Sequence, residues 1–77
     1  MAELQSFIFR TQALHLYRSF LRAVKGAPAE SQGELRREIR RGFDQERGVK
    51  DVYAMKYSLS NGRVQLKQLR DMLGMRH

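Results

Sequence analysis

Apolar residues recur every three or four positions along the first third of the chain, which is the spacing of one face of an α-helix. This pattern predicts a helix from about Glu3 to Lys25, which Gly26-Ala27-Pro28 then ends. Arg18 lies directly beside the apolar face, where either solvent or a partner would meet its charge. The residues expected on the buried face are Phe7, Leu14, Tyr17, Leu21 and Val24, with Ala13 and Phe20 widening it.

A second helix is predicted after the proline. Ser31-Gln32-Gly33-Glu34 has the pattern of a capping box, in which serine and glutamate side chains satisfy free N–H groups at a helix start. Leu35, Ile39 and Phe43 follow at intervals of four and share one narrow face. Gly48 then ends this helix.

The third segment contains Asn61-Gly62, a dipeptide that often forms a hairpin turn. The apolar residues nevertheless keep one helical phase before and after it, so we expect a single helix from about Val49 to Leu73. Gly62 falls on the same buried face, at a cost of about 1 kcal/mol relative to alanine. Such a glycine makes sense where a neighbouring helix or a ligand approaches closely. The apolar residues of this face are Val52, Met55, Leu59, Leu66, Leu69 and Leu73.

These segments predict an all-α fold, an antiparallel three-helix bundle with short loops, formed by residues 1–77 as a single domain. A chain of 77 residues buries only a small core. It has no cysteine for a disulfide, and its two histidines suggest no metal site. We therefore expect its stability to come from close helix packing or from a partner.

Charge indicates the kind of partner. The net charge is +7, and arginine is strongly preferred to lysine. Arg18, Arg22 and Lys25 share one face of the first helix, and the second helix has its own basic face, with Arg36, Arg40 and Arg47 in line. These faces could be a solvated surface, or they could contact a nucleic acid, an anionic membrane surface or an acidic protein.

Other function classes find little support in the sequence. No catalytic motif or phosphate-binding glycine loop is present, so we expect a binding protein and not an enzyme. No apolar run approaches the roughly 20 residues that span a bilayer. The N-terminal MAELQSFIF lacks the basic start of a secretory signal, while import without a cleaved presequence stays open.

Specific residues add a resemblance to a known family. Leu16-Tyr17-Arg18, followed by Phe43 in a basic helix, resembles the LYR-motif (complex I LYR-like) family of small mitochondrial proteins. The similarity covers nearly the whole chain. It extends over Arg10-x-Gln12-x-Leu14 before the tripeptide, Ile39-Arg40-Arg41-Gly42-Phe43 with Arg47 after it, and Gly62-x-x-Gln65-Leu66-Lys67-x-Leu69 near the C-terminus.

The resemblance implies a partner. Family members bind the acidic mitochondrial acyl carrier protein, whose phosphopantetheine arm carries an acyl chain that inserts between the three helices. This chain would hold no cofactor of its own, because the carrier presents the acyl-phosphopantetheine. One departure is Asp44, where several members have a basic residue. By position, the residues expected to bind the carrier are Arg10, Leu16, Tyr17, Arg18, Arg22, Arg36, Arg40, Phe43 and Arg47. Those expected to line the acyl tunnel are Leu14, Tyr17, Leu21, Ile39, Phe43, Leu59, Gly62 and Leu66.

The resemblance also implies a larger mitochondrial assembly, in the matrix or on the matrix side of the inner membrane. An accessory subunit or assembly factor of respiratory complex I is favoured. The alternative is a subunit or assembly factor of the mitochondrial ribosome or of ATP synthase, with the arginine faces contacting rRNA in the ribosome. In some iron–sulfur pathway clients a co-chaperone recognises the tripeptide, and the sequence leaves open whether it does so here.

Overall fold

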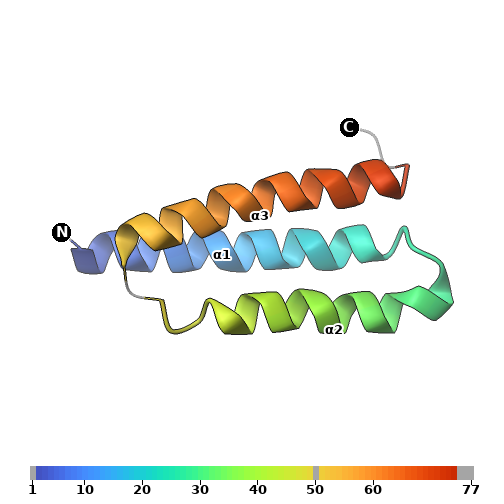
Figure 1. The fold of residues 1–77 in the computed structure, drawn as a ribbon, viewed down its shortest axis with the longest axis horizontal. Helices are drawn as coiled ribbons and strands as arrows, with labels where there is room; N and C mark the ends of the chain where they lie inside the picture. The colour runs from blue at the N-terminus through green and yellow to red at the C-terminus, as the bar shows by residue number, and fades with distance from the viewer. Residues whose placement is uncertain (1, 50, 75–77) are drawn as a thin grey trace.

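Three α-helices make up the fold. The computed structural model describes residues 2–49 and 51–74, and the helices within them are α1 (Ala2–Val24), α2 (Ala29–Gln45) and α3 (Val52–Met72). α1 and α3 run in the same direction and α2 runs in the opposite one, so helices that are consecutive in the chain are antiparallel (Figure 1). The described ranges contain no strand, and the predicted all-α, three-helix fold is confirmed.

The start of α2 differs from the prediction. The helix begins at Ala29, directly after Pro28, and no side chain caps its first N–H groups. Pro28 has a φ of −56° and its carbonyl oxygen accepts a hydrogen bond from Ser31 N (2.9 Å), so the helical path is set before the serine is reached. The Gln32 side chain donates to Ala27 O (3.0 Å) and ties the helix to the turn. The predicted capping box at Ser31 is therefore wrong.

α3 runs without a break through Asn61-Gly62, which confirms the single helix predicted from its apolar phase. It begins at Val52, slightly later than the predicted Val49, because Asp51 caps it. Asp51 Oδ1 accepts a hydrogen bond from Tyr53 N (3.2 Å). The carboxylate thus satisfies one of the free N–H groups at the helix start and fixes where the helix begins.

α1 is the central helix of the fold. It packs against both α2 and α3, whereas no Cα atom of α2 lies within 8 Å of a Cα atom of α3 among the described residues. The Cα trace measures 43 × 24 × 15 Å, so the molecule is elongated and wider than it is deep, and α1 lies beside both α2 and α3 (Figure 1). The bundle is therefore open between α2 and α3.

The core is small and centred on α1. A buried cluster consists of Phe20, Ala23 and Leu66, and the side chains packed against it are Leu16, Ile39, Phe43 and Leu69. The accessible surface is 6179 Å², whereas a compact protein of this mass exposes about 4,900 Å². The chain thus exposes roughly 1,300 Å² more than a compact monomer, which is the scale of surface that a partner covers.

The N-terminal half of the predicted α1 face is not covered. Phe7 is 67% exposed and Leu14 is 54% exposed, so the prediction that they are buried is wrong. α1 has 23 residues and α2 has 17, or about 35 Å and about 26 Å, and α2 stops short of the first turns of α1 (Figure 1). Toward the C-terminal end of α1 the prediction is confirmed at Phe20 and Val24, which are buried, and the buried face there also includes Ala23.

Gly62 of α3 lies directly against Leu16 of α1. A Cβ atom placed on this half-buried glycine would be 2.7 Å from Leu16 Cδ2, closer than carbon atoms tolerate. The prediction that Gly62 faces inward is confirmed. The missing side chain therefore makes room for Leu16, and the helix–helix contact accounts for the glycine.

We expect Gly62→Leu to destabilise the free protein by about 1–3 kcal/mol, because the added side chain has to displace Leu16 and separate α1 from α3. Gly62→Ala should change stability less, since the gain in helix propensity of up to about 1 kcal/mol opposes a contact with the movable end of Leu16. Urea denaturation of both variants, each also combined with Leu16→Ala, measures this. A Gly62→Leu protein as stable as the wild type would show that the position faces open space.

Candidate functional site: a groove between the helices

An open groove of about 1220 Å³ lies where the three helices meet. Its apolar side chains come from every helix, because α2 and α3 flank α1 without closing on each other. α1 contributes Phe9, Ala13, Leu14, Leu16, Tyr17 and Phe20, α2 contributes Ile39 and Phe43, and α3 contributes Met55, Tyr57 and Leu59. The groove thus combines apolar side chains from all three helices with polar and charged ones, and one side of it is open to solvent.

An aromatic cluster holds α2 against α1 at this groove. The rings of Tyr17 and Phe43 are 5.1 Å apart at 69°, and those of Phe20 and Phe43 are 5.8 Å apart at 76°. Both pairs have the edge-to-face geometry in which the positive edge of one ring meets the negative face of the other. Phe43 of α2 therefore contacts two aromatic rings of α1, and Ile39 packs beside it against the core.

The tripeptide Leu16-Tyr17-Arg18 connects the three helices. Successive residues of a helix point about 100° apart, so its side chains face three directions. Leu16 packs against Gly62 of α3, Tyr17 packs against Phe43 of α2, and Arg18 is exposed. The first two residues thus make contacts within the fold and also line the groove, and the side chain of the third is exposed outside it.

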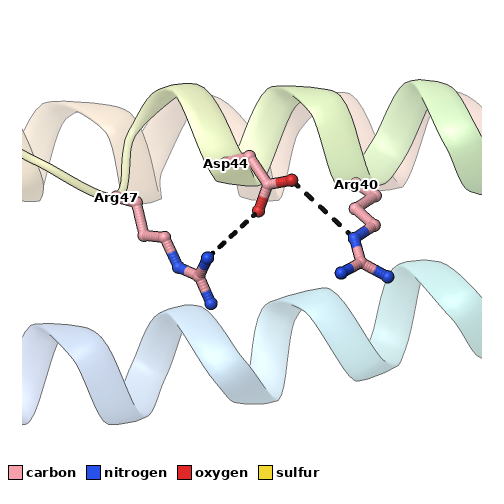
Figure 2. Close-up of polar contacts among 3 residues, drawn as sticks. All are labelled: Arg40, Asp44 and Arg47. Atoms are coloured by element: carbon pink, nitrogen blue, oxygen red, sulfur yellow. Dashed lines mark ion pairs between the residues drawn. The ribbon is translucent and has the colours of Figure 1, made fainter.

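Three charged side chains from the C-terminal end of α2 and the turn after it line the groove. Asp44 lies between two arginines, with Oδ2 3.7 Å from Arg40 Nε and Oδ1 3.9 Å from Arg47 Nη1. Figure 2 shows Arg40 and Asp44 on α2 and Arg47 just after it, with all three side chains extending toward α1. All three are exposed, so solvent screens these pairs.

The groove is electrically balanced despite the basic chain. Its described lining has three arginines, Arg10, Arg40 and Arg47, and three carboxylates, Glu38, Asp44 and Glu46. Glu38 accepts a hydrogen bond from Arg41 (2.6 Å) and Glu46 accepts one from Ser58 (3.1 Å), which leaves Asp44 as the carboxylate paired with arginines of the groove itself. Most of the positive charge therefore lies on outer surfaces.

The structure brings many of the predicted site residues together. The groove is lined by Arg10, Leu14, Leu16, Tyr17, Ile39, Arg40, Phe43, Arg47, Leu59 and Gly62. The other predicted residues lie elsewhere: Arg18, Arg22 and Arg36 are exposed outside the groove, Leu21 is half-buried outside it, and Leu66 is buried in the core. Arg22 donates to Ser19 (3.0 Å) on the outer surface of α1.

Sequence reasoning missed several groove residues. Met55 belongs to the predicted apolar face of α3 and Gln65 to the C-terminal motif, so both had a signal in the sequence. No feature of the sequence indicated the Glu46–Ser58 hydrogen bond, because it joins the end of α2 to α3 across the loop between them.

Comparison with known proteins agrees with this architecture. The family described as Complex 1 protein (LYR family) matches residues 11–68, which contain the tripeptide and most of the groove. The chain belongs to this family. It is 33% identical over 67 residues to LYR motif-containing protein 2 of Xenopus tropicalis, covering 86% of this chain and 77% of that protein, which agrees with the resemblance in the sequence. No solved structure matches the chain. Within residues 2–49 and 51–74, no helix is both long and apolar enough to cross a membrane.

The aromatic cluster predicts a graded loss of stability at Phe43. Phe43→Ala should cost about 2–3 kcal/mol, less than the loss of a fully buried phenylalanine, because Phe43 is only partly buried. Phe43→Leu should cost about 1 kcal/mol, since it keeps apolar contact but loses the edge-to-face geometry. Urea denaturation followed by circular dichroism checks both values. If the two variants were equally stable, the ring geometry would not contribute.

Proposed function

We propose that this protein is a mitochondrial LYR adaptor that binds an acylated acyl carrier protein. The acyl chain on the phosphopantetheine arm lies in the groove, and the protein serves as an accessory subunit or assembly factor of a large mitochondrial complex, with respiratory complex I favoured. Membership of the Complex 1 LYR family supports the class of function. The groove supports the choice of an acyl chain as the ligand.

The observation that carries the proposal is the open apolar groove built from all three helices. Its volume of about 1220 Å³ exceeds the roughly 300–1,000 Å³ of ordinary small-molecule sites, so there is room for a long chain. Leu16, Ile39 and Leu59 line it with aliphatic surface. Each buried methylene contributes about 0.8 kcal/mol, so eight methylenes contribute about 6 kcal/mol before the costs of ordering the chain. The bound chain would thereby add apolar contacts to a core that is small and open.

The charge of the chain favours an acidic carrier. The net charge of +7 attracts an acidic protein during its approach, which raises the association rate more than the final affinity. Arg10, Arg40 and Arg47 are placed at the groove, where the carrier has to dock if its arm enters there. Their guanidinium groups suit carboxylates and phosphates.

Charge reversal at the groove tests the proposal. Arg40→Glu combined with Arg47→Glu should reduce affinity for a tetradecanoyl-loaded carrier at least tenfold while the protein stays helical, because both partners would then be acidic. Arg37→Glu combined with Arg63→Glu is the matched control, since it makes the same change in charge at two exposed arginines outside the groove. Isothermal titration calorimetry gives the affinities. Equal loss in both double variants would argue against docking at the groove, and unchanged binding in the first would argue against the proposal.

A ribosomal function is the alternative, and the exposed arginines outside the groove favour it. Arg36, Arg37 and Arg41 are exposed on α2, where they could contact RNA phosphates. Titration with RNA at several salt concentrations separates the two functions. Phosphate binding weakens linearly in log salt whatever the RNA sequence, and it would not depend on the acyl length of a carrier.

Partner binding should also stabilise the protein. A ligand that binds only the folded form adds about 2.7 kcal/mol at one hundred times its Kd, which for a domain of this size raises Tm by roughly 10–20 °C. We expect this shift with the acylated carrier and a smaller one with the unacylated carrier, whose contacts exclude the apolar groove. Thermal melts of the three samples measure it. A free chain with a high Tm that neither carrier changes would contradict the expectation.

A further inference from the structure

Asp44 sits at the one place in the groove where two arginines converge on the same anion. Its two carboxylate oxygens lie 3.7 Å from a nitrogen of Arg40, one turn before it on α2, and 3.9 Å from a nitrogen of Arg47, three residues after it and just beyond the end of α2 (Figure 2). Arg10, across the groove on α1, makes no ion pair with the described residues. The arrangement resembles a binding site for a small anion that the protein fills with its own carboxylate.

Helix stability does not explain the carboxylate. Exposed ion pairs of this kind contribute little to folding. Asp44 also lies in the last turn of α2, where the negative end of the helix dipole disfavours an acidic residue, and this turn has no basic residue. A residue that is unfavourable for its helix and close to two groove arginines is better explained by its effect on the groove.

We propose that Asp44 is a specificity-determining residue that occupies the place of a ligand phosphate between Arg40 and Arg47. A covalently attached carboxylate competes at a high effective concentration, so a free phosphate cannot displace it easily. A phosphate linked to an apolar chain is different, because contacts in the groove hold it next to the arginines. Asp44 thus lowers the affinity for free phosphate more than the affinity for a phosphate that is linked to an apolar chain.

This inference rests on the proposed function only for the source of the phosphate, which would be the phosphodiester of the carrier's arm. The competition between Asp44 and a phosphate for the two arginines is argued from the described residues alone. Replacing Asp44 by an uncharged residue leaves the described lining with three arginines and two carboxylates, an excess of one positive charge. Both arginines would then be free to donate to a ligand phosphate.

The test compares Asp44→Asn with Asp71→Asn. Asp71 is a matched control, because it is an exposed aspartate in an ion pair with Lys67 (3.4 Å) near the end of α3 and does not line the groove. Affinity is measured by calorimetry for the tetradecanoyl-loaded carrier and, separately, by NMR titration for inorganic phosphate. We expect Asp44→Asn to tighten carrier binding about threefold to tenfold at low salt, with a smaller gain at high salt. It should also give measurable phosphate binding that the wild type lacks, and Asp71→Asn should behave as the wild type.

A further variant locates the effect. Arg40→Gln added to Asp44→Asn should remove most of the gain for both ligands, because one of the two donors is then missing. Equal gains in Asp44→Asn and Asp71→Asn would overturn the inference, since net charge alone would explain them. So would a wild type that binds free phosphate as well as Asp44→Asn does.

The two proposals fail in different ways. If the wild type binds the carrier but Asp44→Asn changes neither affinity, the role of Asp44 is wrong and the adaptor function stands. If no variant binds the carrier but Asp44→Asn gains phosphate binding that depends on Arg40, the adaptor function is wrong and the competition by Asp44 stands.

Discussion

The contacts of Leu16 and Tyr17 hold this fold together. Adjacent residues of one helix face different directions, and here one reaches Gly62 of α3 while the other reaches Phe43 of α2. Because α2 and α3 do not pack on each other in the described residues, each depends on α1 for its position. The groove, its aromatic wall and its charged rim all follow from these two neighbouring attachments.

Because α2 and α3 both pack on α1 and not on each other, the fold buries a small core and leaves apolar side chains accessible to solvent. Six hydrophobic residues count as buried among the described ones, and aliphatic side chains that would face one another in a closed bundle line the groove. The charges on the groove balance, so the basic character of the chain is expressed mainly outside it. The excess positive charge of the chain and the balanced charges of the groove thus lie on different residues.

The sequence contained most of the information on helices and less on how they assemble. α3 was predictable through Asn61-Gly62 because apolar residues on both sides share one phase. The helix starts were not: α2 begins at Ala29, before the expected cap at Ser31, and α3 begins at Val52 after Asp51 and not at the expected Val49. Tyr17 and Phe43 were found through their motif, whereas the opening between α2 and α3 has no sequence signal. Apolar phase shows which face of a helix is buried and not which neighbour covers it.

The open side of the groove bears on how fast a long ligand could enter. In a closed bundle a flexible chain has to thread lengthwise between helices, or the helices have to separate first. Here α2 and α3 are joined near one end by the Glu46–Ser58 hydrogen bond and the short loop after α2, and the side between them is open. A chain bound in this groove would therefore enter sideways, segment by segment, and threading would not limit its rate of entry.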